Sequence, residues 1–502
     1  MNGFPALDLD PFDEGFLADP YLQHPQLRDA GPVVWLESIG CFAMARHAEV
    51  QAALKDWQTY VSGRGVGLAD FSREEPFRPP SLLLEVDPPL HDRTRGLMNK
   101  VTSLAGLRAG MPLWRDKASA LVARLLEGGH IDAVADLGEA YPLSVFPDLI
   151  GLRDNGREHL IPYGTTVFNA FGPRNRILEE GIAAAGEAIA WVNESCQRQH
   201  LKPHGWGMQV YEAADRGDCT PAEAERLVRS FLSAGVDTTV NGLANLVLAL
   251  AQNPDQWVLL RADPTLGKKA FEESLRWGGV IQTFFRTTSR SVDIAGGMIP
   301  KGSKVLLFLA AANRDPRRWD NPDAFDIARN TSGHVGFGFG IHQCLGQMVA
   351  RLEAEAVLDA LVAQVAEIRP SALPTFRLNN TLRALAHVPV QLIAAGGECG
   401  KAARFPTRSA ERRFGLHPQQ AAQFGIIIAV KQHKTDPRHG CAAVFPTVIG
   451  AHLHHDIARR KGSFAFFHHQ RQFAFDHDPE IDRFGPVHKG VLPVLLWRHG
   501  IF

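Results

Sequence analysis

A mainly helical fold with small β-sheets is predicted for this chain of 502 residues. Helical spacing of apolar residues dominates residues 1–394. One helical segment is unusually long, running from a capping box at Thr220-Pro-Ala-Glu223 to about Gln252, just before Asn253-Pro254. Short β-like runs, such as residues 33–36 and 304–309, separate some of the helices. The long segment, about 30 residues or about 45 Å, is enough to cross a whole domain.

The chain divides into two parts of unequal character. Residues 1–395 are expected to form a folded domain, whose last strand begins at Val388 and precedes an Ala-Ala-Gly-Gly break. Residues 396–502 hold eleven of the 21 histidines and show little periodicity, apart from a strand-like run at residues 425–430. A His-rich segment suggests metal binding. Because these histidines keep no consistent ligand spacing, we expect instead an irregular extension that need not belong to the native protein.

Composition argues against several classes of protein. A formal net charge of −1 gives no reason to expect nucleic acid or an anionic membrane as the main partner. The N-terminus lacks a basic region and a long apolar run, and no later stretch approaches the roughly 20 apolar residues of a membrane span. The six cysteines are scattered without a C-x-x-C pair, which disfavours a disulfide framework or a zinc site. We therefore expect a cytoplasmic protein.

Polar residues interrupt the long apolar helix at Asp237, Thr238 and Thr239. Polar side chains inside an apolar helix are costly unless they have partners. A threonine can also bond to the carbonyl four residues earlier and distort the helix. A solvated helix edge is a poor alternative, because Phe231 and Leu243 on either side are apolar.

A glycine-rich loop contains one cysteine, in the segment Phe337-Gly-Phe-Gly-Ile-His-Gln-Cys-Leu-Gly346. Its glycines allow backbone N–H groups to approach a sulfur atom closely. Residues 345–356 then keep helical spacing, so Cys344 is expected at a helix N-terminus, where a thiolate is favoured over a thiol. A thiolate of this kind suits an axial iron ligand. The alternative is a buried structural cysteine after a glycine turn.

This loop resembles the haem signature of the cytochrome P-450 family, Phe-x-x-Gly-x-His/Arg-x-Cys-x-Gly, at every defined position. The resemblance, to the bacterial class, implies haem b (iron protoporphyrin IX) between the long helix and the loop, with Cys344 as the iron ligand. It also implies that Asp237 and Thr238 relay protons to dioxygen in a groove of the distorted helix. Phe339 departs from the pattern, since relatives usually carry a small residue there.

Further positions match the family. The resemblance implies four residues that bind the haem propionates: His91, Arg95, Arg286 and His342. It also implies a buried structural network of Glu273, Arg276 and Arg329 that holds the cysteine loop against its helix. Taken singly, each of the propionate residues also fits a basic surface position, and a Glu–Arg pair three residues apart is most often a solvated ion pair.

A narrower resemblance, over about residues 7–394, is to bacterial enzymes that oxidise para-substituted benzoic acids such as 4-methoxybenzoate. The segments that carry it are Arg64-Gly-Val-Gly-Leu, Arg78-Pro-Pro-Ser-Leu, Tyr141-Pro-Leu-Ser-Val-Phe-Pro-Asp, Phe168-Asn-Ala-Phe-Gly-Pro, Leu227-Val-Arg-Ser, Gln282-Thr-Phe-Phe-Arg-Thr-Thr and Ser332-Gly-His-Val-Gly-Phe.

This resemblance implies two sets of substrate-binding residues. Those at the carboxylate are Arg78, Ser81, Arg229 and Ser230. Those forming aromatic walls are Phe168, Phe171 and Phe284. Ser230 and Ser233 share a helical face with Asp237, which suits such a site. Ile189 departs from the pattern, since a Gln near the carboxylate is expected there.

The expected reaction is insertion of one oxygen atom from O2 into a small aromatic acid. Electrons are expected from NADH through a ferredoxin reductase and a 2Fe–2S ferredoxin, because the tail has only two cysteines, too few for a fused cluster. One alternative is a monooxygenase that acts on a neutral terpene or fatty acid and needs no cationic clamp. Another is a non-catalytic haem-binding sensor, which gives no reason for Asp237 and Thr238.

Overall fold

The computed structural model describes residues 3–76, 78–396, 426–431 and 447–453. Contacts within the chain separate residues 1–399 from residues 400–501. In the second unit the described elements are two paired strands, β14 (Ile426–Lys431) and β15 (Thr447–Leu453). The strand predicted at residues 425–430 is therefore confirmed, whereas the histidines of the tail fall mostly outside the described residues.

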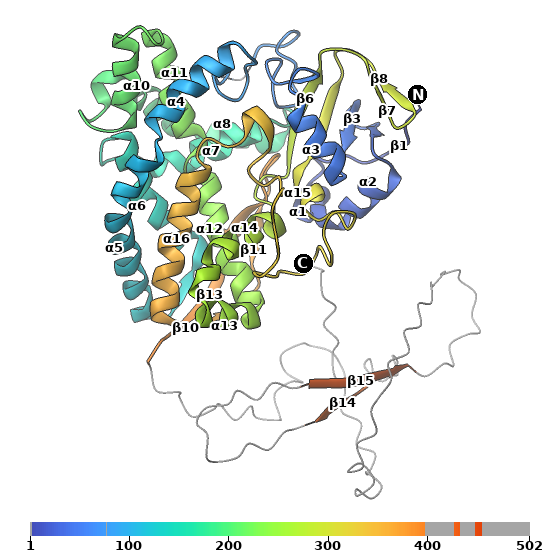
Figure 1. Ribbon diagram of the computed structural model, residues 1–502, viewed down its shortest axis with the longest axis vertical. Helices are drawn as coiled ribbons and strands as arrows, with labels where there is room; N and C mark the ends of the chain where they lie inside the picture. Colours follow the sequence, from blue (N-terminus) through green and yellow to red (C-terminus); the bar gives the residue numbers. More distant parts are fainter. Residues whose placement is uncertain (1–2, 77, 397–425, 432–446, 454–502) are drawn as a thin grey trace, which may run out of the picture. The chain divides into compact units, whose positions relative to one another are not determined.

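The first unit is mainly helical, as predicted (Figure 1). Its α-helices are α1 (Glu14–Ala18), α2 (His24–Ala30), α3 (His47–Lys55), α4 (Leu90–Val101), α5 (Leu104–Gly128), α6 (Ala140–Ile150), α7 (Leu160–Asn169), α8 (Arg176–Ala184), α9 (Gly186–Ser195), α10 (Trp206–Asp215), α11 (Pro221–Ala234), α12 (Asp237–Gln252), α13 (Pro254–Ala262), α14 (Gly267–Gly278), α15 (Leu309–Asn313) and α16 (Gln347–Gln364). Shorter turns are η1 (Pro20–Leu22), η3 (Arg157–His159), η4 (Arg198–His200), η5 (Pro264–Leu266), η6 (Gly340–His342) and one π-helical segment, η2 (Ala133–Glu139).

The strands form small sheets. The largest has six strands in the order β1-β2-β3-β9-β6-β4, namely β1 (Ala6–Leu7), β2 (Val34–Leu36), β3 (Cys41–Met44), β9 (Lys304–Phe308), β6 (Thr283–Thr288) and β4 (Tyr60–Val61). A second has the order β10-β13-β5, namely β10 (Val365–Pro370), β13 (Pro389–Ala394) and β5 (His130–Asp132). Two hairpins are β7 (Val292–Ile294) with β8 (Gly297–Ile299), and β11 (Thr375–Arg377) with β12 (Ala384–His387). The strands predicted near residues 33–36, 304–309 and 388–393 are confirmed.

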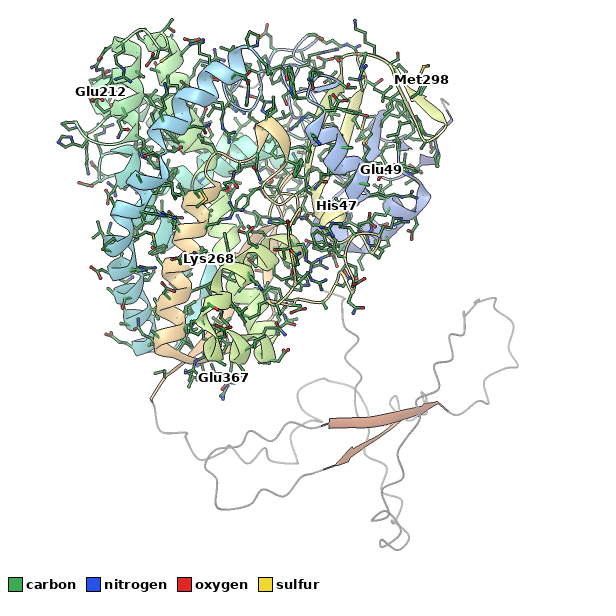
Figure 2. All side chains as sticks on the ribbon, in the orientation of Figure 1. His47, Glu49, Glu212, Lys268, Met298 and Glu367 are labelled. Atoms are coloured by element: carbon green, nitrogen blue, oxygen red, sulfur yellow. The ribbon has the colours of Figure 1, made fainter. Side chains whose placement is uncertain are left out.

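Most of the helices lie on one side of this unit, and the large sheet lies on the other, together with α1, α2, α3 and α15 (Figure 1). Figure 1 shows α5 and α16 side by side within the helical part, with β1, β3 and β6 on the opposite side. Figure 2 places Glu212 of α10 and Glu367 of β10 at opposite ends of the helical part, and Met298 of β8 at the edge of the sheet part. Helix α12 packs against η2, α14 and α7 and is buried nearly all round, as expected of a central helix.

The long segment at residues 220–252 begins and ends as predicted, but it is two helices rather than one. The capping box is present: the Thr220 hydroxyl accepts from the Glu223 N–H, and the Glu223 carboxylate accepts from the Thr220 N–H. Helix α11 ends at Ala234, and α12 starts at Asp237. At Gly235 a Cβ atom would lie 2.0 Å from the Phe146 ring, so the ring packs where only glycine leaves room.

The segment Pro221–Gln252 is also long and apolar enough to span a membrane. However, 83% of its most apolar window is buried inside the protein, and no other described helix meets these criteria. Burial of this extent is what a central core helix requires.

Candidate active site

A cavity of about 280 Å³ lies between the α11–α12 break and the cysteine loop. Its lining is mostly apolar, and many of the polar residues predicted from the sequence contribute to it. The predicted polar residues that line the cavity are Arg78, Ser81, Arg95, Arg229, Ser230, Thr238, Arg286, His342 and Cys344, and the predicted aromatic ones are Phe168, Phe171 and Phe284. Phe339 also lines it, whereas Ile189 of α9 packs against the core and is not part of the lining.

The cysteine loop is held in shape by glycines and by one backbone bond. The Cys344 N–H donates to the Phe337 carbonyl at 2.9 Å, which closes the loop. Gly340 has φ of 73°, and a Cβ there would lie 2.5 Å from the Leu54 carbonyl oxygen, so no larger residue fits. Helix α16 begins three residues after Cys344, at Gln347, close to the predicted helix start.

The Cys344 thiol is open toward the cavity that it lines. Burial raises the pKa of the Cys344 thiol, although backbone N–H groups of Gly346 and Gln347 and the Arg95 guanidinium act in the opposite direction. The helix end therefore favours a thiolate, as predicted, while the protein around the open cavity opposes it. A metal ion reverses this balance, because a coordinating thiol is deprotonated outright.

Four basic residues predicted to act together do lie together. The rings of His91 and His342 are 4.5 Å apart, and the Nε2 atom of each is buried with no hydrogen-bond partner among the described residues. Burial lowers the pKa of Arg286 to about 10, although Asp87 nearby acts in the opposite direction. Burial likewise lowers the pKa of His342 to about 3, so this ring is neutral. Arg95, the fourth member, lines the same cavity.

The two residues predicted for proton transfer occupy different surroundings. The Thr238 hydroxyl donates to the Ala234 carbonyl at 2.8 Å, across the helix break, and Thr238 lines the cavity. Asp237 is buried behind it and is not part of the lining. Its carboxylate accepts from the Thr165 hydroxyl at 2.9 Å and lies 3.4 Å from an Arg377 nitrogen. Burial raises the pKa of Asp237, and Arg377 opposes that effect.

The predicted Glu–Arg–Arg network is present and buried. Arg276 donates to both oxygens of Glu273, from Nε at 2.6 Å and from a terminal nitrogen at 2.7 Å, and Arg329 Nε donates to Glu273 at 3.1 Å. The further bonds of Arg276 go to carbonyls of Asn313, Pro322 and Ala324. The network bonds directly to the segment 313–326. Asn313, at the end of α15, connects this segment to the residues before the cysteine loop, because its side chain accepts from the Val335 N–H.

Hydroxyls and guanidinium groups gather at the end of the cavity near α11. Ser81 and Ser230 lie with their hydroxyl oxygens 3.4 Å apart. Arg78 donates to buried Glu85 at 2.9 Å, and Arg229 bonds Asn193 and Glu225.

Sequence reasoning missed one basic residue at this end, Arg226. It lines the cavity, donates to the Pro80 carbonyl at 2.5 Å and has no ion-pair partner among the described residues. Its Nε is buried without a hydrogen-bond partner there. The available signal was its spacing, four residues before Ser230 on the same helical face.

Aromatic rings form another part of the cavity lining, next to the basic end. Phe171 lies between Phe168 and Phe284, with ring centroids 5.8 and 5.6 Å away and edge-to-face geometry. The Arg78 guanidinium lies 5.7 Å from the Phe171 ring centroid, so the basic end and the aromatic wall are continuous. The cavity therefore offers donors at one end, flat apolar walls along its length, and a thiol facing it.

Comparison with known proteins agrees with this arrangement. Residues 206–364 match the family described as Cytochrome P-450. The chain is 53% identical over 394 residues to cytochrome P-450 CYP199A2 of Rhodopseudomonas palustris, a match that covers 78% of this chain and 96% of the relative. It is 31% identical over 404 residues to cytochrome P-450 107B1 of Saccharopolyspora erythraea, covering 76% of this chain and 98% of the relative.

Solved structures give the same result for the fold. Cytochrome P-450 CREJ in complex with (4-ethylphenyl) dihydrogen phosphate matches with a TM-score of 0.68 and 27% identity, over 78% of this chain and all of that one. P-450 BioI in complex with a fatty-acyl carrier protein matches with a TM-score of 0.67 and 28% identity, over 76% of this chain and all of that one. The chain belongs to the cytochrome P-450 family of haem monooxygenases, because it is 53% identical to one member over nearly the whole length of that member.

Proposed function

We propose that this enzyme inserts one oxygen atom from O2 into a para-substituted benzoic acid. One observation carries the proposal: a single cavity joins a cluster of hydroxyls and guanidinium groups, an aromatic wall and Cys344. A flat ring with a carboxylate at one end fits that order of groups. The para position, opposite the carboxylate, then lies toward Cys344.

The residues around Cys344 fit haem. Cys344 would bind the iron, and Arg95 and Arg286 would donate to the two propionates. In His91 and His342 the Nδ1 atom already faces an oxygen, of Asp92 and Leu83 respectively, so each buried Nε2 would donate to a propionate only from a protonated ring, the form that the negative propionate favours. Charge-assisted bonds of this kind satisfy buried carboxylates well. When bound, haem supplies the activation of dioxygen, to which a thiolate ligand contributes electron density.

Thr238 and Asp237 would handle protons near the haem. The Thr238 hydroxyl donates its proton to the Ala234 carbonyl, which holds the helix open at the break, so its oxygen would accept from a proton donor at the cavity wall. Asp237 lies one residue earlier, between this wall and the half-exposed Arg377. A carboxyl group in that position would pass protons inward from the Arg377 side.

The basic end of the cavity would hold the substrate carboxylate. A carboxylate that enters an apolar cavity loses hydration, which only charged groups or hydrogen-bond donors replace. The Ser81 hydroxyl would donate to it, and so would Ser230 after turning from the Arg226 carbonyl, to which it donates at 3.1 Å. Arg226 supplies a positive charge that no carboxylate among the described residues pairs with. Arg78 and Arg229 are paired with Glu85 and Glu225, and so contribute less net charge.

The chemistry on 4-methoxybenzoate would be oxidative demethylation. A C–H bond of the methyl group becomes C–OH, and the second oxygen atom leaves as water with two electrons and two protons. The resulting hemiacetal collapses to a phenol and formaldehyde. The electrons would come from NADH through a ferredoxin reductase and a 2Fe–2S ferredoxin, and the enzyme would work in the cytoplasm.

A neutral terpene or fatty acid is the second candidate class. The ligands of the two solved relatives match different classes: that of CREJ is a para-alkylated phenyl ring with a phosphate group, whereas that of BioI is a fatty acyl chain. A neutral substrate would leave the unpaired Arg226 charge without a role. Family membership favours the monooxygenase over the non-catalytic sensor.

The test compares 4-methoxybenzoate with its methyl ester and with the 3-methoxy isomer. Substrate binding is followed by the haem absorbance change, and oxidation by formaldehyde release with a ferredoxin pair. We expect the ester to bind at least about tenfold more weakly, because it lacks the charge, and the 3-isomer to be oxidised poorly. Equal binding of acid and ester would exclude the benzoate assignment and leave the monooxygenase chemistry intact.

A further inference from the structure

Glu272 connects two elements that flank the cysteine loop. It lies on α14, next to Glu273, but it serves different partners. Its carboxylate accepts from His334 Nε2 at 2.7 Å and from Arg351 Nε at 2.5 Å, and a second Arg351 nitrogen lies 3.2 Å away. His334 lies just before the loop and Arg351 lies on α16, just after it. One carboxylate therefore connects both ends of the loop to α14.

The His334 ring passes this connection to the loop backbone. The Gly336 N–H donates to His334 Nδ1 at 3.1 Å, so Nδ1 is an acceptor and the ring proton resides on Nε2, facing Glu272. Glu272 thus orients the His334 ring, and the ring bonds the Gly336 N–H. The carbonyl of the next residue, Phe337, accepts from the Cys344 N–H.

Arg351 carries the charge in this cluster. Its guanidinium lies 4.6 Å from the Phe337 ring centroid and donates to the Gln347 side chain at 2.7 Å, at the start of α16. Its positive charge therefore lies against Phe337, the residue whose carbonyl accepts from the Cys344 N–H. Burial opposes ionisation of Glu272, but His334 and Arg351 outweigh that effect and lower its pKa to about 2. At neutral pH the carboxylate is therefore ionised and balances the Arg351 charge.

We propose that Glu272 is a positioning residue for the Cys344 ligand, which it affects through the charge of Arg351 and the orientation of His334. The inference depends on the proposal that Cys344 binds the haem iron. Hydrogen bonding and net charge around a thiolate ligand set the reduction potential of the centre. Without the Glu272 charge, uncompensated Arg351 stabilises the more negative, reduced state, so the potential should rise.

The experiment uses the substrate-free holoenzyme and four variants. Glu272→Gln removes the balancing charge, Arg351→Gln removes the positive charge, and a double variant removes both. Glu355→Gln is the matched control: Glu355 lies on α16, one turn beyond Arg351, and pairs with Arg115 at 2.9 Å instead. The reduction potential is measured by spectroelectrochemical titration, and the ferrous-CO spectrum of each protein reports whether the thiolate ligand is intact.

We expect a more positive potential in Glu272→Gln, a more negative one in Arg351→Gln, and a value near the parent in the double variant and in Glu355→Gln. A potential in Glu272→Gln equal to that of the control overturns the proposal. The proposal is also overturned if the reduction potential of the double variant stays as positive as that of Glu272→Gln. Removing both charges restores the parent potential only if the two residues act through their charges, not if they form a merely structural ion pair. If Glu272→Gln fails to hold haem, the opposite shift in Arg351→Gln remains the deciding measurement.

The failure of the proposed function gives a different result. If the parent protein itself lacks the thiolate-type ferrous-CO spectrum, Cys344 is not the ligand and the haem assignment fails. If that spectrum is present in every variant and the potentials do not move, the haem assignment stands and the role of Glu272 is wrong.

Discussion

Asp237 and Thr238 are adjacent in the chain, yet the Thr238 side chain lines the cavity whereas the Asp237 side chain is buried away from it. The Thr238 hydroxyl reaches back to the Ala234 carbonyl and lines the cavity. The Asp237 carboxylate turns away, to the Thr165 hydroxyl at 2.9 Å and the Asn241 amide at 3.1 Å. One step along the backbone therefore separates a hydroxyl at the cavity wall from a buried acid behind it.

Replacement of Thr238 by Ala should uncouple electron consumption from product formation. Without the hydroxyl, no oxygen at this place in the cavity wall accepts from a proton donor beside the dioxygen substrate, so more oxygen should leave as peroxide. The measurement is product and peroxide formed per NADH consumed, with a saturating ferredoxin pair. Thr238→Ser keeps a hydroxyl and should recover most of the coupling. Unaltered coupling in Thr238→Ala would remove the residue from the proposed mechanism.

Cys344→His should abolish the thiolate-type spectrum of the ferrous-CO complex. Imidazole is a neutral ligand and donates less electron density to iron than a thiolate does. Cys219→Ser is a suitable control, because Cys219 is buried before α11 and is not part of the cavity lining. If the Cys344 variant kept the parent spectrum, another residue would have to bind the iron.

The sequence predicted the local features well where one segment carries the whole pattern. The capping box at Thr220, the strands near residues 33–36 and 304–309, and the helix after the cysteine loop all depend on neighbours in the chain. The helix distortion predicted from the threonines is also present, since the Thr238 hydroxyl donates to the Ala234 carbonyl. The packing of Phe146 against Gly235 was not predicted, because Phe146 belongs to a distant helix.

Long-range polar contacts were the least predictable part of the site. The Glu272–His334–Arg351 cluster joins residues 62 and 79 positions apart, and no local pattern indicates that pairing. Similarly, the sequence placed Asp237 at the site but did not predict its link to Arg377, 140 positions away. The carbonyls of Asn313, Pro322 and Ala324 that Arg276 bonds were likewise not predicted, because they lie 37 to 48 positions away.

Arg226→Gln should weaken binding of 4-methoxybenzoate and leave binding of its methyl ester nearly unchanged. A bond to a charged group contributes roughly 1.5–3 kcal/mol, so the acid should bind about tenfold more weakly or worse. Arg226→Lys keeps the charge and should lose less. A substitution of Arg78 would test the charge less directly, because it would also leave the buried Glu85 carboxylate without its ion-pair partner. If acid and ester weakened equally in Arg226→Gln, the residue would act on the shape of the cavity rather than on charge.

A chain that ends at Ala395 should fold and incorporate haem. Every residue that lines the cavity lies before that position, and the 53% identical relative is matched over 96% of its length by 394 residues of this chain. The measurement is the haem content of the purified truncated protein, compared with the full chain expressed in parallel. Loss of haem in the truncated protein alone would show that residues 396–502 contribute to the fold.

Glu353 should make the protein less stable as the pH rises. It lies on α16 with no exposed surface, and both carboxyl oxygens lack a hydrogen-bond partner among the described residues. Burial raises the pKa of Glu353 well above its ordinary value of 4.5. Below pH 4.5 the Glu353 carboxyl is protonated in both the folded and the unfolded state, so it does not lower the free energy of unfolding.

Above that value the unfolded chain releases the proton and the folded protein keeps it. Stability then falls by about 1.4 kcal/mol per pH unit until the folded pKa is reached. Glu353→Gln removes this dependence, so its unfolding temperature should exceed that of the parent at pH 8 by more than at pH 5. Thermal unfolding of the two holoproteins at both pH values measures this difference. The control is Glu367→Gln, at a partly exposed glutamate, whose difference in unfolding temperature from the parent should be the same at pH 5 and pH 8. If the difference in unfolding temperature between Glu353→Gln and the parent did not change with pH, the Glu353 carboxyl would have a hydrogen-bond partner in solution. Its pKa would then not be raised by burial.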